Sequence, residues 1–418
     1  MKKKIVIIGA GFAGLNLAQK LEKKEFSVFL IDKNNYHQFQ PLFYQVATAG
    51  LEANSIIFPL RKAFQGYKNI HIRMAELVEI VPQENKIITT QEDFYYDYLV
   101  IATGATTNFF GNKQIEEHAI PMKSVSEALY LRNRFLENLE NAYYADATQK
   151  EALKNIVIVG GGPTGVEVSG AIADMKKYVL SKDYPELDFS LMKIFLIEGA
   201  PTLLGPMSPQ AQQKSKEYLE EMGVEVLTGT VVKEYDGETA LLSNGKTILT
   251  KTLIWAAGVT SEKIKGLPTE VLQRGNRIKV NRYNQIEGFD NVFALGDIAF
   301  MTEEKYPNGH PQVASVAIDQ GKLLAENLVL MSQNKPMKRF EYFDKGSMAT
   351  VGKRKAVVDL PFWKFQGAFA WHTWNIIHLF LILGVKNKFA IFFNWAINYF
   401  SNNSNLRTLI KPFSKNTM

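Results

Sequence analysis

The sequence predicts an α/β protein that begins two parallel β-sheets in the same way, about 150 residues apart. At both places a short apolar run of β-forming residues ends in glycine, which is typical of a fully buried parallel strand. A helical pattern and a second strand follow each run. The expected strands are Lys4–Gly9, Ser27–Asp32, Asn155–Gly160, Leu191–Glu198, Val224–Leu227, Thr252–Trp255 and Val292–Ala294, and the expected helices are Leu15–Lys24 and Val166–Leu180.

Length and composition limit the classes of protein to which the chain can belong. Its 418 residues predict two or three domains, and 46% hydrophobic residues are enough for a sizeable core. The absence of cysteine excludes disulfides, thiolate chemistry and iron–sulfur clusters, and it favours a reducing compartment. No signal peptide precedes the first strand, so we expect the body of the protein to be cytoplasmic. The net charge of +6 alone does not indicate a nucleic-acid partner, and we expect none.

A glycine-rich loop of the form G-x-G-x-x-G joins the first strand to the helix in both units. The first glycine allows a tight turn, the second lets the backbone approach a pyrophosphate, and the third lets the helix pack closely on the strand. The free N–H groups at the start of the helix stabilise the phosphate charge. These loops predict two Rossmann-like dinucleotide-binding domains. The candidate residues are Gly9, Gly11, Phe12, Ala13 and Gly14 in the first loop and Gly160, Gly162, Pro163, Thr164 and Gly165 in the second.

An acidic residue ends the second strand of each unit, where a carboxylate can accept hydrogen bonds from ribose hydroxyls. Asp32 lies 23 residues after Gly9. Glu198 lies 38 residues after Gly160, a longer spacing that a predicted insertion at 181–189 explains. Because a carboxylate repels a 2′-phosphate, Glu198 predicts that NADH is preferred over NADPH.

Three further segments resemble signatures of the flavoprotein reductases that bind two dinucleotides. Ile101–Gly104 is similar to the ATG segment that closes the FAD domain, Trp255–Gly258 to its counterpart in the NAD domain, and Ala294–Asp297 to a late GD motif. The resemblance implies that FAD occupies the first unit and NADH the second, with the NAD domain inserted in the FAD domain. It adds Lys33, Thr103, Gly104, Asp297 and Ala314 as FAD-binding candidates and Ala257 and Gly258 as NADH-binding candidates.

The absence of cysteine also limits the electron acceptor. Relatives that reduce disulfides need a redox cysteine, so a quinone, a small carrier protein or oxygen remains. Three segments are similar to type II NADH dehydrogenases, namely Phe39–Thr48, His310–Gly321 and Asp344–Gly352. This resemblance favours a membrane quinone and implies quinone-proximal residues. They are Ser315, Asp319, Gln320 and Gly346, of which Ser315 and Asp319 stand where many members have glutamine.

The last 55 or so residues are rich in aromatic side chains and have a helical period. Phe369–Val385 is shorter than the roughly 20 residues that a spanning helix needs, and Phe389–Phe400 is shorter still. Polar residues recur within one sector of each helix, and cations lie between and after the helices. This pattern predicts an amphipathic anchor at 365–418 that lies in the membrane interface. The alternative is a pair of helices buried against the core or a dimer partner. The polar residues are His372, Asn375, His378, Asn394 and Asn398, and the cations are Lys386, Lys388, Arg407 and Lys411.

The expected domains are 1–115 and 286–345 for FAD, 116–285 for NADH and 346–418 for membrane association. Glu167, in the first turn of the second glycine-loop helix, is the candidate catalytic residue, since the resemblance places a glutamate there near flavin and nicotinamide. A carboxylate in a first helical turn also has a structural explanation, because it complements the helix dipole.

The predicted enzyme passes hydride from NADH to FAD and electrons to quinone without pumping protons. We expect a peripheral homodimer on the cytoplasmic face of the inner membrane, with no metal. The alternatives are a reductase for a rubredoxin-like or ferredoxin-like carrier and a non-catalytic NADH sensor.

Overall fold

The computed structural model describes residues 2–401 and 406–410, and its contacts divide the chain into two units, which are described separately. The predicted strands and helices are all found, with bounds that differ by a few residues. The predicted residue Lys411 lies outside the described residues. The first unit comprises Met1–Gln38, Phe58–Thr106 and Val259–Asp344, and the second comprises Phe39–Ile57, Thr107–Gly258 and Lys345–Met418.

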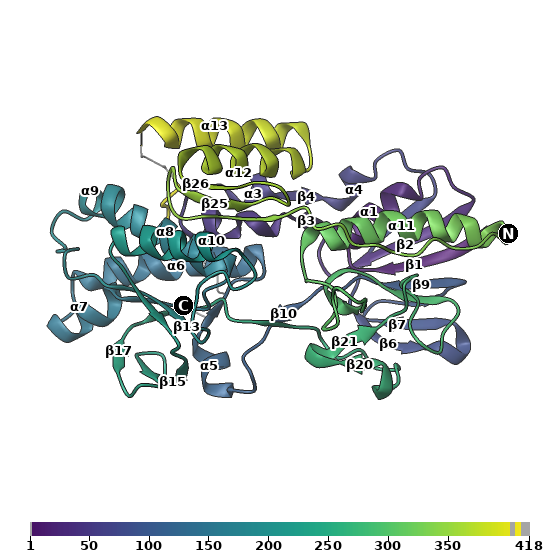
Figure 1. The fold of residues 1–418 in the computed structure, drawn as a ribbon, viewed down its shortest axis with the longest axis horizontal. Coiled ribbons are helices and arrows are strands. Elements are labelled where there is room, and N and C mark those ends of the chain that lie inside the picture. The colour runs from purple at the N-terminus through teal and green to yellow at the C-terminus, as the bar shows by residue number, and fades with distance from the viewer. Residues whose placement is uncertain (1, 402–405, 411–418) are drawn as a thin grey trace, which may run out of the picture. The chain divides into compact units, whose positions relative to one another are not determined.

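The first unit is built on a five-stranded parallel sheet (Figure 1). The helices α1 (Phe12–Lys20) and α11 (Ala314–Ser332) pack against each other, and a Cβ at Gly321 would lie 2.5 Å from the Ala13 carbonyl oxygen. Glycine at that position therefore sets the close approach of the two helices. The strands in spatial order are β22 (Val292–Ala294), β9 (Tyr98–Ile101), β1 (Lys3–Ile8), β2 (Phe26–Asp32) and β5 (Ile70–Met74).

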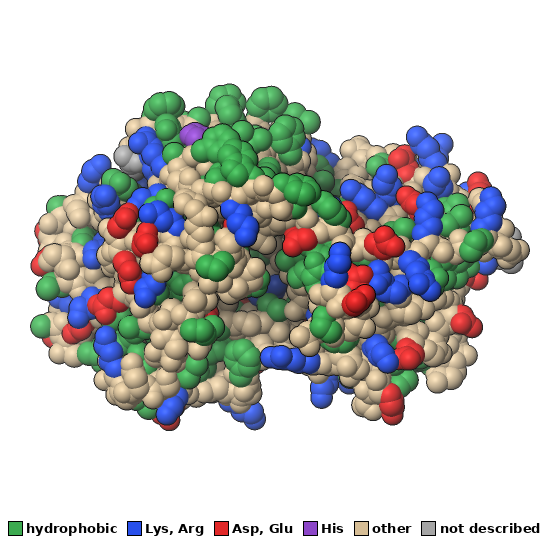
Figure 2. All heavy atoms as spheres, viewed as in Figure 1, with side chains coloured by type: hydrophobic (Ala, Val, Ile, Leu, Met, Phe, Trp, Pro, Cys, Tyr) green, Lys and Arg blue, Asp and Glu red, His purple; other side chains and the backbone are tan. Residues whose placement is uncertain are grey.

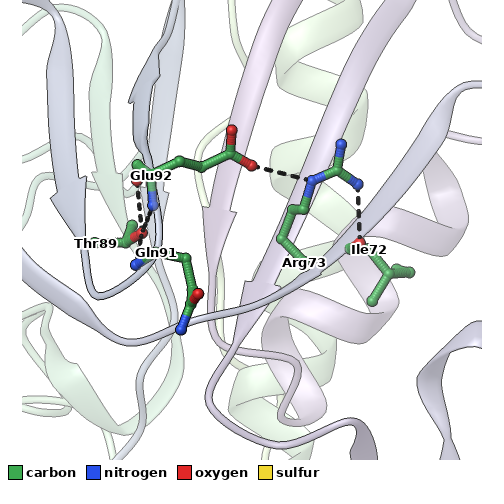
Figure 3. Close-up of polar contacts among 5 residues, drawn as sticks. All are labelled: Ile72, Arg73, Thr89, Gln91 and Glu92. Atoms are coloured by element: carbon green, nitrogen blue, oxygen red, sulfur yellow. Dashed lines mark hydrogen bonds and ion pairs between the residues drawn. The ribbon is translucent and has the colours of Figure 1, made fainter.

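An antiparallel sheet in the same unit lies beside the edge strand β5. In Figure 3, Arg73 at the end of β5 reaches toward Glu92, with its Nε 3.3 Å from the carboxylate, and also donates to the Ile72 carbonyl. The Thr89 hydroxyl donates to the Glu92 carbonyl and holds the turn that presents this carboxylate. The sheet consists of β6 (Leu77–Val81), β7 (Lys86–Thr89) and β8 (Asp93–Tyr95).

Residues 259–285, which the prediction assigns to the NADH domain, make their contacts within the first unit. The reason is strand pairing: β21 (Arg277–Lys279) runs parallel to β23 (Ala299–Phe300), and Lys265 bridges to Glu79. Residues 39–57 belong instead to the second unit, because α2 (Phe43–Ala47) packs on α6 (Val125–Ala142) and α8 (Pro163–Met175). The limits of the two nucleotide domains therefore stay a prediction.

The second unit repeats the strand pattern of the first around its own parallel sheet. Helix α8 follows the central strand, β12, and continues as a π-helix over Lys176–Leu180. The sheet order is β11 (Ile120–Pro121), β18 (Thr252–Trp255), β12 (Ile156–Val159), β13 (Ile194–Glu198) and β14 (Val224–Thr228). The other main elements are α3 (Ala53–Ile56), α5 (Lys113–His118), α7 (Ala147–Lys154), α9 (Ser181–Asp183), α10 (Pro209–Glu221), β15 (Val232–Tyr235), β16 (Thr239–Leu242) and β17 (Thr247–Leu249).

The C-terminal part of the second unit is a small antiparallel sheet with two helices. Helix α12 (Ala368–Leu381) packs on the sheet, and α13 (Val385–Ser401) packs on α12 and α3, so that α12 lies between α13 and the strands (Figure 1). No helix within residues 2–401 and 406–410 is both long enough and apolar enough to cross a membrane. The sheet consists of β24 (Ser347–Thr350), β25 (Ala356–Asp359) and β26 (Lys364–Gln366).

Candidate functional site

The first glycine loop is shaped by close approaches of the backbone. Gly9 has a φ of +99°, and a Cβ there would lie 2.3 Å from the carbonyl oxygen of Ala102. A Cβ at Gly14 would lie 1.9 Å from the Gly9 carbonyl oxygen. Gly11 has no heavy atom within 4 Å of its Cβ position, so its outer side is open. The first and third glycines thus serve the fold, and the second leaves space for a ligand.

The second glycine loop repeats this geometry in the other unit. Gly160 has a φ of +109°, and a Cβ there would lie 2.7 Å from the Ala256 carbonyl oxygen, while a Cβ at Gly165 would lie 1.8 Å from the Gly160 carbonyl oxygen. The Cβ position of Gly162 is open. Both loops therefore have the same division between two packing glycines and one open glycine.

The carboxylate of Asp32 holds the first loop by its backbone. One oxygen accepts the N–H of Ala10 at 2.7 Å, and the other accepts the N–H of Asn34 at 2.7 Å. Burial raises the pKa of Asp32, and these two N–H donors oppose that rise. Asp32 is thus fixed beside the loop that it was predicted to serve.

Glu198 makes the equivalent pair of bonds in the second unit. Its Oε2 accepts the N–H of Gly161 at 2.5 Å, and its Oε1 accepts the N–H of Ala200 at 2.6 Å. Each acidic strand end therefore uses both oxygens to join the second residue of its glycine loop to the turn after its own strand.

The start of each following helix can receive an anion. Gly11 and Gly162 are the N-caps of α1 and α8, and no side chain of the described residues caps either helix. Uncapped N–H groups next to an open glycine fit a pyrophosphate in both units. The residues present therefore fit a dinucleotide at each loop.

His37 is a contributor to the first loop that the sequence reasoning missed. The side chain is buried, its Nδ1 lies 2.9 Å from the Ala10 carbonyl oxygen, and its ring packs edge-on against Phe12. Burial lowers the pKa of His37, so the ring is neutral and Nδ1 donates its proton to that carbonyl. Its position five residues after Asp32, the end of the second strand, was a signal that could have identified it.

The Gly296–Asp297 turn is assembled by residues of α11 and the segment before it. The Gln320 side-chain oxygen accepts the Gly296 N–H at 2.7 Å, and the Gln312 amide donates to the Asp297 carbonyl at 3.0 Å. A Cβ at Gly296 would lie 3.4 Å from the Ala13 Cβ, so the turn lies close to the first glycine loop. Gln320, predicted to be quinone-proximal, therefore supports this turn.

A buried guanidinium lies beside the same turn. Arg277 donates to the carbonyls of Ala299 at 2.6 Å and His310 at 3.0 Å. Burial lowers the pKa of Arg277, and the Asp297 carboxylate opposes that shift. Arg277 is thus a second residue that the sequence reasoning missed.

The remaining predicted residues lie on turns and helix ends of their own units. In the first unit, Lys33 and Thr103 are exposed, Gly104 has a φ of +73°, and Ala314 begins α11. Ser315 hydrogen-bonds the Tyr342 hydroxyl, and Asp319 lies one turn further along α11.

In the second unit, Ala257 and Gly258 follow β18, and Pro163 and Thr164 begin α8. A Cβ at Gly346 would lie 2.3 Å from the Asp359 carbonyl oxygen, so this glycine permits the entry to β24. Its predicted proximity to quinone is not tested by this packing.

Glu167 is a buried carboxyl on the first turns of α8. Only 8% of the residue is exposed, and its Oε1 lies 3.4 Å from the backbone N–H of Thr350. Burial raises the pKa of Glu167 from 4.5 to about 8, and the Thr350 N–H opposes the rise. At neutral pH the side chain is therefore mostly protonated and can donate or accept a proton.

Glu167 is buried because α8 runs very close to β24. A Cβ at Gly170 would lie 2.4 Å from the Gly352 backbone nitrogen. Tyr44 of α2 completes the enclosure: its hydroxyl lies 2.9 Å from Thr350 Oγ1, and burial together with the Glu167 carboxyl raises its pKa.

A cavity of about 80 Å³ opens beside Glu167. It connects the carboxyl to Thr164 of the second glycine loop and to the predicted segment Phe39–Thr48. The lining residues are Gln40, Pro41, Phe43, Tyr44, Met122, Lys123, Thr164 and Glu167.

Comparison with known proteins agrees with this geometry. Residues 3–321 match the family described as Pyridine nucleotide-disulphide oxidoreductase, and residues 345–402 match the NDH2 C-terminal domain. The Type II NADH:quinone oxidoreductase Ndh of Mycobacterium tuberculosis is 33% identical over 416 residues, covering 96% of this chain and 89% of the relative. The chain belongs to the type II NADH:quinone oxidoreductase family.

Other relatives give the same result. The Type II NADH:quinone oxidoreductase of Staphylococcus aureus is 30% identical, covering 85% of this chain and 89% of the relative. The structure of NDH2 from Plasmodium falciparum in complex with NADH has a TM-score of 0.91 at 23% identity, covering 98% of this chain and 100% of that chain, and it shows the fold. The predicted membership of the type II family is confirmed.

Proposed function

We propose that this type II enzyme binds FAD at the first glycine loop and NADH at the second, and that it reduces a membrane quinone without pumping protons. The observation that carries the proposal is the paired geometry: two open loops, each held by a carboxylate, together with a buried carboxyl on the helix of the second loop. When bound, FAD supplies the redox chemistry, by accepting hydride from NADH and passing two electrons to quinone.

On the FAD side, the chain supplies binding and orientation. Gly11 and the start of α1 receive the pyrophosphate, and the Asp32 oxygens, already oriented by Ala10 and Asn34, accept the ribose hydroxyls. The turn held by Gln320 presents Asp297. The other proposed contacts are Gly9, Phe12, Ala13, Gly14, Lys33, Thr103, Gly104 and Ala314.

On the NADH side, the chain supplies selectivity as well as binding. Glu198 lies at the loop with one oxygen on the Gly161 N–H. A 2′-phosphate would bring negative charge to this carboxylate, so NADH is preferred. The other proposed contacts are Gly160, Gly162, Pro163, Thr164, Gly165, Ala257 and Gly258.

Glu167 handles protons during turnover. Reduction of one quinone by NADH consumes one proton from solution in addition to the hydride. A carboxyl with a pKa of about 8 is mostly protonated at neutral pH yet can lose its proton within the working range. Ser315, Asp319, Gln320 and Gly346 stay proposals as quinone-proximal residues.

The C-terminal helices present an apolar face that we assign to the membrane surface. In Figure 2, hydrophobic side chains gather over α12 and α13. The exposed residues of α13 recur at helical spacing, which marks a single face. A lipid surface is the occupant that also delivers the lipid-soluble acceptor. This apolar face comprises Phe369, Ile376, Phe380, Leu381, Val385, Phe389, Phe392, Phe393, Ile397 and Phe400.

Three polar side chains of these helices are bonded within their own helix. Asn375, Asn394 and His378 each bond the backbone carbonyl one turn earlier, at 2.8 to 3.0 Å. Burial lowers the pKa of His378 to about 4, so it stays neutral. Satisfied, uncharged polar groups suit helices that lie in a membrane interface.

The predicted headgroup cations divide into two sets. Lys386 is exposed, and the Lys388 ammonium donates to the Phe380 carbonyl between the helices. Arg407 instead pairs with Asp183 of α9, so it is held by the protein and not by lipid. The peripheral position on the cytoplasmic face and the homodimer are parts of the proposal.

The test is anaerobic. The bound flavin is reduced with NADH, and its reoxidation is followed by absorbance after mixing with a water-soluble quinone, a ferredoxin or a rubredoxin. Rapid reoxidation by quinone alone is expected. Reoxidation by a carrier protein alone would establish the soluble reductase, and reoxidation by none of the three would favour the NADH sensor.

A further inference from the structure

A chain of hydrogen bonds runs from the apolar helix pair to the neighbourhood of Glu167. The indole N–H of Trp395 on α13 donates to the side-chain oxygen of Gln45 at 2.7 Å. The Gln45 amide nitrogen donates to the Tyr44 hydroxyl at 2.9 Å. That hydroxyl lies 2.9 Å from Thr350 Oγ1. All four residues belong to the second unit, so the chain is a property of that unit alone.

The chain has a fixed direction because its first member can only donate. An indole N–H has no acceptor, so the Gln45 oxygen must face Trp395, and its NH₂ group must face Tyr44. The Tyr44 oxygen therefore accepts from Gln45, which leaves the hydroxyl proton of Tyr44 available for Thr350 Oγ1. The Trp395 N–H on α13 thus orients the buried Tyr44 hydroxyl through the Gln45 side chain that lies between them.

The chain ends at the residue that contacts the carboxyl. The Thr350 backbone N–H lies 3.4 Å from Glu167 Oε1 and favours the ionised carboxylate. The Tyr44–Thr350 bond helps to hold Thr350 in this place, together with its pairing to Ala356 of β25. The other titratable groups near Glu167 are Lys123 beside the cavity, Asp174 further along α8, and Lys353 in the turn after β24.

We propose that Trp395 and Gln45 are positioning residues, which act through Tyr44 and Thr350 to hold the proton-handling carboxyl of Glu167. The inference rests on the proposed function, since that function gives Glu167 its role. It also gives α13 a second role, because the helix that offers its apolar face to lipid has its inner face bonded to the reaction site.

Removal of the Trp395 donor should loosen the whole chain. Without it, the Gln45 amide can turn and accept the Tyr44 proton, and Thr350 loses its partner. A weaker N–H contact destabilises the Glu167 carboxylate, so its protonation midpoint should rise by roughly 0.5 to 1 unit, the equivalent of one lost hydrogen bond.

The midpoint can be read directly by infrared difference spectroscopy of the oxidised holoenzyme as the pH is changed. The band of the protonated carboxyl is assigned by its loss in Glu167→Gln. Trp395→Phe should raise the midpoint, whereas Trp371→Phe on α12, whose ring lies against Tyr399, should leave it unchanged. Gln45→Met is the second route if Trp395→Phe does not fold.

A double variant tests whether the residues act in series. Tyr44→Phe should shift the midpoint, and adding Trp395→Phe should shift it no further, because one chain is broken only once. Additive shifts, or equal midpoints in Trp395→Phe and Trp371→Phe, would overturn the inference. If the wild-type enzyme reduces no quinone but Trp395→Phe still shifts the protonation midpoint of Glu167, the proposed function fails and the positioning chain stands.

Discussion

Glu167→Gln removes the titration of a buried carboxyl while keeping its shape. In the folded protein Glu167 holds its proton up to a pH of about 8, whereas its ordinary pKa is 4.5. Between these values the folded chain binds one proton more than the unfolded chain, so the free energy of unfolding falls as the pH rises. The variant has no such proton and should be spared this loss.

The magnitude follows from the two pKa values. The loss is about 1.4 kcal/mol for each pH unit between 4.5 and 8, or about 5 kcal/mol in all. Most of it has occurred by pH 6.5, and about 2 kcal/mol remains to be lost between pH 6.5 and 9. For a chain of 418 residues, that remainder corresponds to a change of about 2 °C in melting temperature.

The assay is differential scanning calorimetry of both proteins, saturated with FAD, at pH 6.5 and 9. The melting temperature of Glu167→Gln should gain about 2 °C on that of the wild type between the two values, while its turnover with quinone falls. Asp174→Asn is a matched control, because burial raises the Asp174 pKa only to about 6, which lies below the range of pH 6.5 to 9 that is compared. If the difference in melting temperature between Glu167→Gln and the wild type is the same at pH 6.5 and pH 9, Glu167 is not protonated at neutral pH and the reasoning is refuted.

Four other outcomes are expected. Asp32→Ala should lose bound FAD, measured by flavin absorbance per protein, because the Ala10 and Asn34 amides lose their shared acceptor; a full flavin complement would contradict its role. Glu198→Gln should raise kcat/KM for NADPH relative to NADH by about tenfold, the effect of roughly 1.4 kcal/mol, and an unchanged ratio would remove Glu198 from selectivity. Gly170→Ala should lower the free energy of unfolding by about 1–3 kcal/mol, since its Cβ meets the Gly352 nitrogen at 2.4 Å, and a urea midpoint equal to wild type would show that the helix can shift. The double variant Phe389→Asp/Phe393→Asp should sediment less with anionic lipid vesicles than the wild type, whereas Phe343→Asp, an exposed control outside the apolar face, should not. Equal sedimentation of the wild type and both variants, or a change only in oligomeric size, would argue against lipid as the occupant.

The sequence predicted the parts of the fold that depend on local pattern. Apolar runs that end in Gly9 and Gly160 became the central strands of two sheets, and the acidic strand ends lie at the loops, as the spacing indicated. The helical period of the C-terminal segment located α12 and α13 within a few residues. In each case the residues that decide the structure are neighbours along the chain.

Contacts between distant segments were beyond this reasoning. The enclosure of Glu167 depends on Thr350, 183 residues away, and on Tyr44, whose partner Thr350 is 306 residues away. Gln320 also shows the limit: the motif predicted a quinone neighbour, but its burial and its bond to Gly296 depend on the packing of α11. Only the fold determines which residues far apart in the chain share one bond.

The two acidic strand ends also affect the free energy of nucleotide binding. Asp32 and Glu198 each hold their loop through two backbone N–H groups of the protein itself. Binding therefore requires little ordering of the loop, and less affinity is lost to entropy. The shape of both glycine loops is thus set by bonds within the protein, and a nucleotide does not have to create it.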